Sequence, residues 1–480
     1  MKILNVLLLV IITNFSFSQS GYTDIEIQAR QKIFSLKFNE AENILKDNKT
    51  ATSNYLLCYE NFLQNLLIGG TDNYSKFEKQ FNVSSKFIEK AEDDSLKLSY
   101  LSEINLQNAI IKLLNRDFIS GAVSFIKSYG YFKDSEKKYP KSFYNLKLNA
   151  LYNIIGGITP DKGKVFLSAI GLHGDISKGL SQMNSYVLKT EKKPLYYSEA
   201  FIMNMLIVAF MKEDVGNIQI PKLSHKIENN SLFIFSKIMI DYKEHKYFDI
   251  NNNINLLSQQ NITELPYVYY ILGIINSINN KEKAIKNLKV FLIKNKSKHF
   301  IKASNWQLAR IAVLQNNESD FVKYKQNTLE LGSAFTEADK QALAEASLKH
   351  KPNIVLLKAR LLFDAGEYAQ AKSVLLKKEN KTIIKTNEEY VEFFYRLARL
   401  YFEESDITKA KKYYKLVVDK QEVSERYFAP YSALQLGIIY EDEKNYIKAK
   451  KYYNIALEIN TGEYKNSIKH KANSRLENLN

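Results

Sequence analysis

The sequence predicts an all-α protein built as a superhelical array of antiparallel helix hairpins. Turn-forming residues are sparse, since the 480 residues include only 7 Pro and 17 Gly, whereas a β-protein needs frequent turns. Apolar residues recur at three- and four-residue spacing, as they do on one face of a helix. The hexapeptide KAKKYY occurs at Lys409–Tyr414 and again 39 positions later at Lys448–Tyr453. This recurrence indicates a repeated structural unit.

Residues 1–18 have the layout of a secretory signal peptide. Lys2 precedes the apolar run Ile3–Ile12, and Ser16 to Ser18 place small residues at a cleavage position. The run is about ten residues long, roughly half of what a membrane-spanning helix needs. We therefore expect a cleaved signal peptide and an exported protein, periplasmic or secreted, with no transmembrane helix after cleavage.

Composition narrows the classes of partner. The formal net charge is +16, but the Lys residues are spread along the chain and no Arg-rich block is present, so we expect no nucleic-acid partner. Peripheral association with the cell envelope stays open. Cys58 is the single cysteine, which excludes an intramolecular disulfide, and its apolar surroundings in the sequence favour a buried thiol.

The two copies of KAKKYY end stretches with the same arrangement of small residues. Ala398 precedes Ala410 by 12 positions, and Gly437 precedes Ala449 by 12. Two helices pack closely only where a side chain at the crossing is small, and aromatic rings then fill the space beside it. A third copy lies in LLKARLLFDAGEYAQAKSVLL. The structural repeat positions are Ala359, Gly366, Ala371, Ala398, Ala410, Gly437 and Ala449.

This arrangement resembles the tetratricopeptide repeat, in which a small residue is followed by an aromatic residue three positions later and by Ala 12 positions later. Ala371, Ala410 and Ala449 are 39 residues apart, whereas the usual repeat is 34, so the helices or connections must be longer here. We expect regular tetratricopeptide repeats over residues 346–480 and an irregular, degenerate helical region of the same kind over residues 19–345.

A narrower resemblance rests on the segment SAIGLHGDISKGLSQM. It is similar to the tetratricopeptide repeat protein 39 group of eukaryotes and its bacterial relatives, with Gly171, Gly174, Gly179 and Leu180 at the matching positions and Leu172 where an aromatic residue is commoner. The group resembles a set of non-enzymatic repeat proteins, so this likeness implies the fold more than an activity.

Motifs for chemistry are absent from the sequence. No two of the six His are closer than 20 residues, which excludes a paired helical metal site. GGITPDKGK departs from a phosphate-binding loop, because five residues separate Gly157 from Gly163 and Val165 replaces the hydroxyl residue. We expect no enzyme activity, no catalytic residues, no metal and no cofactor.

The resemblance to tetratricopeptide repeats implies a groove, because the first helix of each hairpin lines the concave face of such arrays. An Arg and a Phe recur there 39 residues apart and could hold a carboxylate and an apolar side chain of an extended peptide. The alternative is that the Phe residues belong to the core and the Arg residues pair with nearby Glu. The groove positions are Arg360, Phe363, Tyr395, Arg399, Phe402, Tyr431 and Glu441.

The sequence therefore predicts an exported, non-enzymatic scaffold that binds a protein or peptide partner in its concave groove. The alternative function is an envelope carrier or sensor of an apolar or anionic small molecule, which requires a closed pocket near Gly171–Leu180. The oligomeric state and the identity of the partner stay open.

Overall fold

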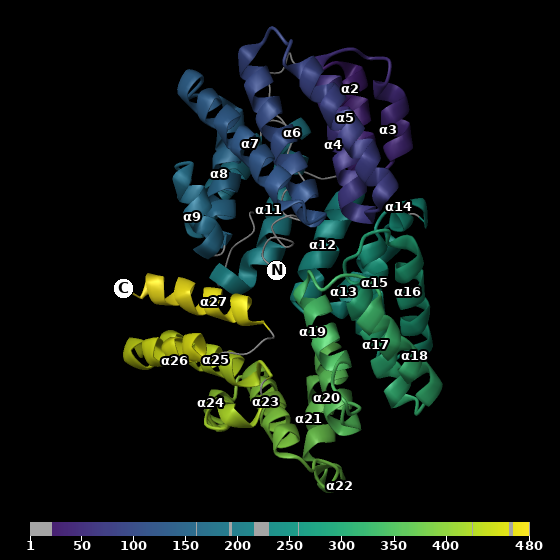
Figure 1. Cartoon of the computed structure of the whole chain (residues 1–480), viewed down its shortest axis with the longest axis vertical. Helices are drawn as coiled ribbons and strands as arrows, with labels where there is room; N and C mark the ends of the chain where they lie inside the picture. Colours follow the sequence, from purple (N-terminus) through teal and green to yellow (C-terminus); the bar gives the residue numbers. More distant parts are fainter. Residues whose placement is uncertain are drawn as a thin grey trace. The chain divides into compact units, whose positions relative to one another are not determined.

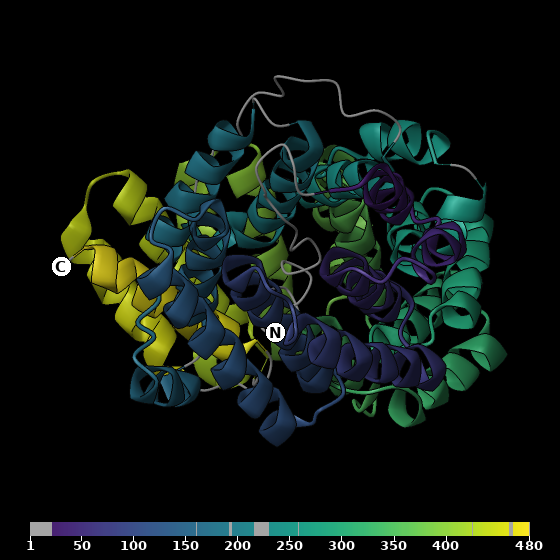
Figure 2. The same ribbon diagram turned by 90° about the horizontal axis from the view of Figure 1, so that it is seen from above.

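The computed structural model describes residues 22–159, 161–191, 194–215, 230–257, 259–424, 426–459 and 464–479. The expected signal peptide, residues 1–18, lies outside these residues. In the described part every regular element is a helix and no strand occurs, as Figures 1 and 2 show. The expected fold class, an all-α array of antiparallel helix hairpins, is confirmed.

The chain divides into two compact units. The N-terminal unit runs to residue 268 and includes residues 293–297, and the C-terminal unit comprises residues 269–292 and 298–480. Helices of the N-terminal unit are α2 (Asp24–Phe34), α3 (Phe38–Leu45), α4 (Ala51–Ile68), α5 (Thr71–Ile88), α6 (Asp94–Leu114), α7 (Phe118–Lys138), α8 (Phe143–Ile158), α9 (Asp161–Ala169), α10 (Ile176–Thr190), α11 (Pro194–Val215), α12 (Ser231–Lys243), α13 (Tyr247–Asn255) and α14 (Gln259–Thr263).

Two helices, α15 (Pro266–Asn276) and α16 (Lys281–Lys294), contain the positions at which the chain divides. The regular repeats are expected to begin at residue 346. The C-terminal unit begins earlier, at residue 269, and continues beyond these two helices. Its remaining helices are α17 (Ile301–Leu314), α18 (Glu318–Glu330), α19 (Glu337–Ala346), α20 (Ile354–Asp364), α21 (Tyr368–Leu376), α22 (Lys378–Lys381), α23 (Asn387–Glu403), α24 (Ile407–Val418), the 3₁₀-helix η2 (Gln421–Val423), α25 (Phe428–Asp442), α26 (Tyr446–Glu458) and α27 (Lys465–Asn478).

The same turn connects the two helices of many hairpins. In the turn between α23 and α24, Ser405 has φ +60°, and the Asp406 N–H donates to the Tyr401 carbonyl at 2.9 Å, which is the six-to-one bond of a Schellman motif. Among the residues that the structure describes, an equivalent bond closes seven further turns. The residues with positive φ in these eight turns are Leu36, Arg116, Gly171, His245, Asn316, Gly366, Ser405 and Lys444.

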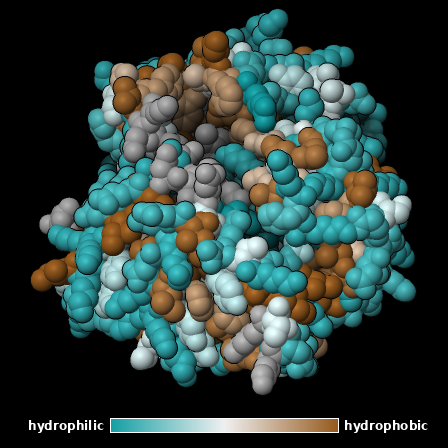
Figure 3. Space-filling model, turned by 60° about the horizontal axis from the view of Figure 1, so that its bottom comes forward, coloured by the Kyte–Doolittle hydropathy of each residue, from teal (hydrophilic) through white to brown (hydrophobic). Residues whose placement is uncertain are grey.

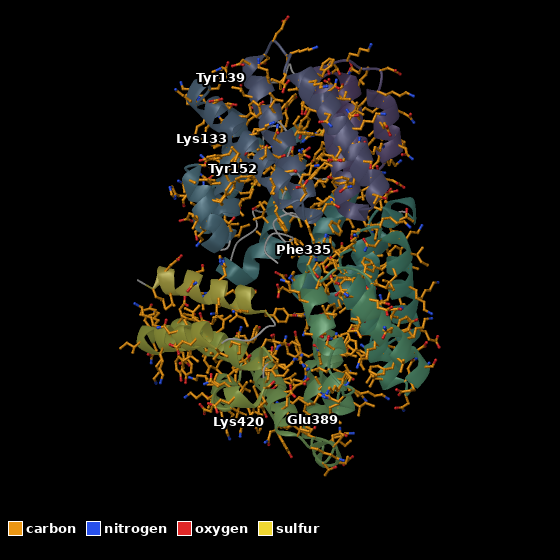
Figure 4. All side chains as sticks on the ribbon, in the orientation of Figure 1. Lys133, Tyr139, Tyr152, Phe335, Glu389 and Lys420 are labelled. Carbon is orange, nitrogen blue, oxygen red and sulfur yellow. The ribbon has the colours of Figure 1, made fainter. Side chains whose placement is uncertain are left out.

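Side-chain caps fix where many helices begin. At α23 the Thr386 hydroxyl accepts from the Glu389 N–H, and the Glu389 carboxylate accepts from the Thr386 N–H, forming a capping box. Glu389, labelled in Figure 4, also accepts from Asn353 Nδ2 at 2.9 Å. Because Asn353 is itself the N-cap of α20, this bond joins the starts of two consecutive first helices.

The core of the C-terminal unit runs between the first and second helices of its hairpins. The hairpins α20–α21, α23–α24 and α25–α26 contribute residues to one continuous cluster of buried apolar side chains, and α27 covers the last hairpin with Ile468 and Ala472. A hairpin alone would leave one apolar face uncovered, so stacking is what stabilises each unit of the array.

A buried ionic network lies at the centre of the N-terminal unit. Arg30 on α2 contacts Glu199 on α11, and Lys147 on α8 contacts Glu103 on α6 and Glu199. Their side chains are 0–3% exposed, and the Tyr55 hydroxyl donates to Glu103 at 3.0 Å. Removing charges from water is costly unless they are paired, so this network fixes how the four helices pack.

The surface of the described residues is mainly hydrophilic, with separate hydrophobic patches on the face drawn in Figure 3. Of the helices in the described ranges, none combines the length and the apolar character that crossing a membrane would require.

Candidate functional site

The predicted groove residues lie on the first helices of three consecutive hairpins in the C-terminal unit. Arg360 and Phe363 are on α20, and Tyr395, Arg399 and Phe402 are on α23. Tyr431 and Glu441 complete the set on α25. We first describe the two guanidinium groups, because they differ in what they contact.

The Arg399 guanidinium lies over an aromatic ring. Its Cζ is 3.9 Å from the centroid of the Phe363 ring and 5.8 Å from that of Tyr395. Among the described residues no hydrogen bond or ion pair involves Arg399, so its N–H donors are not used there. Burial alone would lower the pKa of Arg399, but Tyr395, Tyr431 and Asp364 raise it, so the group stays charged.

Arg360, in contrast, is held by carboxylates. Its Nη1 lies 2.7 Å from Glu345 Oε1, and its Nε lies 3.7 Å from Asp364 Oδ2. For this residue the alternative interpretation, an Arg paired with nearby acidic groups, describes the structure. Phe363 is also a core residue, since it is only 5% exposed.

Glu345 on α19 is the centre of this part of the structure. Its carboxylate also accepts from Arg310 Nη2 at 2.6 Å, from Arg426 Nη2 at 2.9 Å and from Trp306 Nε1 at 2.7 Å. Burial alone would raise the pKa of Glu345, but Arg310, Arg360 and Arg426 lower it well below its usual value. One carboxylate therefore joins α17, α19, α20 and the segment before α25.

The sequence did not predict the cluster of Glu345, Arg310 and Arg426. Arg310 and Arg426 are 35 and 81 positions from Glu345, and Glu345 lies outside the positions at which the repeat predicts a groove. No local spacing could have indicated the cluster, because it forms only when helices distant in sequence come together.

An aromatic wall continues from Arg399 toward α25. The Tyr395 ring is 4.8 Å from Phe428 and meets Tyr431 edge-on at 5.8 Å. Tyr427 meets Tyr464 at 4.8 Å, and offset or edge-on rings at such distances attract one another. Tyr395 is 1% exposed, so it supports the wall rather than lining a surface, whereas Tyr431 keeps partial exposure.

The remaining two groove residues have other surroundings. Phe402 is partly buried and packs against the apolar cluster of the C-terminal unit. Glu441 accepts from the Tyr453 hydroxyl and lies 3.2 Å from Arg475 Nη1, so it joins α25, α26 and α27. It also borders an open depression of about 430 Å³ with Asp442, Lys444, Tyr446 and Leu479. About 15 Å of helix separates Glu441 from Tyr431, at 1.5 Å per residue.

The repeat positions lie where helices approach each other. The alanines at these positions are 0–2% exposed: Ala359, Ala371, Ala398, Ala410 and Ala449. Gly437 packs against the Tyr453 ring so closely that a Cβ would lie 2.3 Å from Tyr453 Cε1. Gly366 has a different role, because its φ of +76° closes the α20–α21 turn, a backbone conformation that glycine adopts without strain.

The repeated hexapeptide has a repeated structural role. Its second Tyr is buried in both copies, with Tyr414 at 1% and Tyr453 at 0% exposure. Its first Tyr stacks on an aromatic residue of the preceding helix. These stacked pairs are Tyr401–Tyr413, with an interplanar angle of 3°, and Tyr440–Tyr452, with one of 11°.

The site offers cations and aromatic faces. Within the described residue ranges, no three His, Cys, Asp or Glu side chains gather as ligands for a metal. What the arrangement can do chemically is bind an anion through guanidinium donors and hold an apolar group against rings.

Comparison with known proteins finds a family that matches part of the C-terminal unit. The tetratricopeptide repeat family model matches residues 391–419 and 431–467, which contain most of α23 and α25, all of α24 and α26, and the start of α27. A search of curated proteins finds no match. Among solved structures, the human IFIT1 dimer with PPP-AAAA is similar over 92% of this chain and 95% of that chain, with 13% identity and a TM-score of 0.30. The chain is therefore similar to tetratricopeptide repeats over residues 391–419 and 431–467, within the region where the sequence repeats itself most regularly.

Proposed function

We propose that the protein is an exported, non-enzymatic scaffold that holds a protein or peptide partner on the surface around Arg399. Tetratricopeptide repeats generally serve protein–protein interaction, and the matched repeats include Arg399 on α23. The observation that most supports this surface is the Arg399 guanidinium, which is supported by the Phe363 ring while its donors have no acceptor among the described residues.

Support by rings makes Arg399 a suitable anchor. A long side chain loses rotamer entropy when a partner binds it, and a side chain that is already held in place loses less. Phe363 and Tyr395 hold the guanidinium from two helices. An acidic group of the partner would accept from this fork, and an apolar group beside it would contact Tyr431 or Phe402, which are partly exposed.

Arg360 contributes to this surface by positioning. Because its guanidinium is paired with Glu345 and Asp364, charge reversal at Arg360 would place a second carboxylate against Glu345 and damage the fold. Arg399 is therefore the residue at which partner binding can be tested without breaking an ion pair among the described residues.

The test is crosslinked capture of partners from envelope and soluble extracts with three tagged proteins: the wild type, Arg399→Glu and Lys420→Glu. Lys420, labelled in Figure 4, follows α24 and is exposed, so Lys420→Glu makes the same charge change away from the site. We expect a protein captured by the wild type and by Lys420→Glu to be lost with Arg399→Glu. Equal capture by all three would place the interface elsewhere, and capture of no specific protein would reject the scaffold.

Export is a separate part of the proposal and rests on the N-terminal sequence. If residues 1–18 are a signal peptide, the mature protein isolated from its native compartment begins at Gln19. N-terminal sequencing measures this directly, and a mature protein that keeps Lys2 in the cell interior would contradict export. Recovery of the partner from the envelope extract alone would support association with that surface.

The alternative of a small-molecule carrier depended on a closed pocket near Gly171–Leu180. A Cβ on Gly174 would lie 2.3 Å from Gly156 Cα, and one on Gly179 would lie 2.6 Å from Ile154 Cγ1. The glycines thus bring this turn close to α8, and this close packing accounts for them. We also propose a relationship to the tetratricopeptide repeat protein 39 group on these glycines, which a structure-based alignment of this contact would test.

A further inference from the structure

Tyr464, the residue before α27, contacts a helix far from its own repeat. Its hydroxyl donates to Gln341 Oε1 on α19 at 2.6 Å, across 123 positions of sequence. Its ring lies 4.8 Å from the Tyr427 ring, with an interplanar angle of 61°. Gln341 and Tyr427 are buried, whereas Tyr464 keeps partial exposure. Gln341 and Tyr427 thus form a site for one phenol ring, here called the Tyr464 site, which is open to water on one side.

The Tyr464 site suits a neutral phenol. Burial raises the pKa of Tyr464 well above its usual value, and Tyr427, Glu345 and Glu337 raise it further, whereas Arg360 lowers it. The hydroxyl therefore keeps its proton near neutral pH and donates it to Gln341. A carbonyl oxygen that receives a hydroxyl proton and a ring that meets another ring edge-on are contacts that any tyrosine side chain can make.

The attachment of Tyr464 and α27 has two weak points. Tyr464 has a left-handed backbone with φ +53°, which is unfavourable for a bulky residue, and strain of this kind is typical of ligand clamps and switches. An ion pair between Arg475 and Glu441 holds α27 at 3.2 Å. Ten residues are buried in α25, whereas only three are buried among the α27 side chains that the structure describes: Ser467, Ile468 and Ala472. Elements with few buried side chains open most easily.

We propose that Tyr464 is an internal stand-in for a tyrosine side chain of the partner, and that the partner binds by displacing it from the Tyr464 site. The Tyr464 site continues the aromatic wall, because Tyr427 also meets Tyr395 at 5.7 Å. Tyr395 in turn lies beside the Arg399 guanidinium. This inference rests on the proposed function, and it adds a residue that the partner must supply and an occupant that holds part of the surface closed until the partner arrives.

The first test measures the Tyr464 site without the partner. Tyr464→Gly in the full chain removes the ring and keeps the turn, since glycine adopts a left-handed backbone without strain. p-Cresol, which is the tyrosine side chain as a free molecule, should bind this variant. It should raise the melting temperature by about 3 °C at ten times its dissociation constant. The wild type should not respond, because Tyr464 already occupies the site.

Two controls separate this site from general binding of phenols. Tyr390→Ala removes a tyrosine on α23 that is 41% exposed and should gain no p-cresol binding. Toluene lacks the hydroxyl and should bind Tyr464→Gly about tenfold more weakly than p-cresol, because it leaves the buried Gln341 oxygen without a donor. Adding Gln341→Leu to Tyr464→Gly should abolish this preference. A folded Tyr464→Gly that does not bind p-cresol, or binds toluene equally well, would overturn the inference.

The second test asks whether Tyr464 competes with the partner. Tyr464→Phe keeps the ring, is the milder change if Tyr464→Gly does not fold, and loses a hydrogen bond that stabilises the closed state. With the extract limiting, Tyr464→Phe should capture about two to ten times more of the protein found with the wild type. p-Cresol, but not toluene, should reduce capture by Tyr464→Gly. If Tyr464 only stabilises the fold, capture by Tyr464→Phe is equal to or lower than that of the wild type, which would overturn the inference.

The outcomes separate this inference from the proposed function. Capture lost with Arg399→Glu but not increased with Tyr464→Phe would reject the displacement of Tyr464 and keep the scaffold surface around Arg399. Binding of p-cresol to Tyr464→Gly, with no specific protein captured from either extract, would reject the scaffold and the displacement together.

Discussion

At the scale of single residues, Glu345 is the central charged group in its part of the C-terminal unit. It is one carboxylate among three guanidinium groups and a Trp N–H. Because its pKa is lowered in the folded protein, the stability it contributes is present above its unfolded pKa, which is about 4.3. That stability is lost as the pH falls below this value.

Replacing Glu345 by Gln should therefore destabilise the protein strongly. The change keeps the size of the side chain but leaves Arg310, Arg360 and Arg426 without their shared anion, and breaking a buried ion pair costs about 3–5 kcal/mol. Urea unfolding at pH 7 measures the loss. Glu318→Gln is the control, because Glu318 and its partner Lys351 are 63% and 51% exposed, and an exposed pair contributes less than about 1 kcal/mol. A loss no larger than that of the control would remove Glu345 from its central role.

The pKa of Glu60 on α4 is shifted in the direction opposite to that of Glu345. It is fully buried, and burial raises the pKa of its carboxyl to about 8. Between its unfolded pKa and pH 8 the folded state therefore holds a proton that the unfolded state releases, so the stability from Glu60 falls as the pH rises through this range.

Glu60→Gln should remove this dependence. Gln is neutral at every pH and similar in size, so the variant should match the wild type near pH 4.5 and exceed it by up to about 5 kcal/mol at pH 8, at about 1.36 kcal/mol per unit of pKa shift. Urea unfolding across this pH range gives the comparison. Glu92→Gln changes an exposed carboxyl and should not alter the slope. A constant difference between Glu60→Gln and the wild type would show that the Glu60 carboxyl has the same pKa in the folded and unfolded states.

At the scale of elements, the second helices α21 and α24 form the same contacts with the hairpin that follows each of them. Lys372 on α21 pairs with Glu404 and lies over the Tyr401 ring. Lys411 on α24 pairs with Glu443 in the same way. It also lies over Tyr440, the residue of α25 equivalent to Tyr401. These contacts follow the Ala position by one residue in each repeat, so the sequence period and the stacking period are the same.

Close approach within the last matched hairpin depends on Gly437. Gly437→Ala should destabilise the protein by about 1–3 kcal/mol, because its Cβ would overlap the buried Tyr453 ring. Gly130→Ala is a matched helical glycine on α7, where a Cβ would have nothing within 4 Å, and should stabilise by up to about 1 kcal/mol through helix propensity. Thermal unfolding compares the two, and equal effects would contradict the tight crossing at Gly437.

At the scale of the whole molecule, the two units should respond separately to local damage. Glu345→Gln should increase amide hydrogen exchange in α17, α20 and α25, whose residues depend on Glu345, and leave α4, α6 and α7 within a factor of about two of the wild type. Exchange measured by mass spectrometry resolves these helices. A uniform increase through both units would show that they unfold together.

The sequence predicted the fold class because helical periodicity is a local property. Periodicity and the KAKKYY copies indicate helices and their crossings without knowledge of distant contacts. The hairpin turns of the irregular region are harder to predict from the sequence. Residues such as Arg116 and His245 adopt positive φ there, at positions where glycine is the usual signal. The pairing of Arg360 with Asp364 is a local contact on one helix. The contacts of Glu345 with Arg310 and Arg426 could not be predicted, since they join residues 35 and 81 positions apart through helix packing.

The single tryptophan of the chain gives this region an optical reporter. Trp306 is 2% exposed, donates to Glu345 and lies with its ring centroid 5.9 Å from Arg310 Cζ. Indole emission shifts with the local electric field, so protonation of Glu345 should change its wavelength without any added label. With no second tryptophan to contribute background, steady-state fluorescence of the unmodified protein can follow this event in real time.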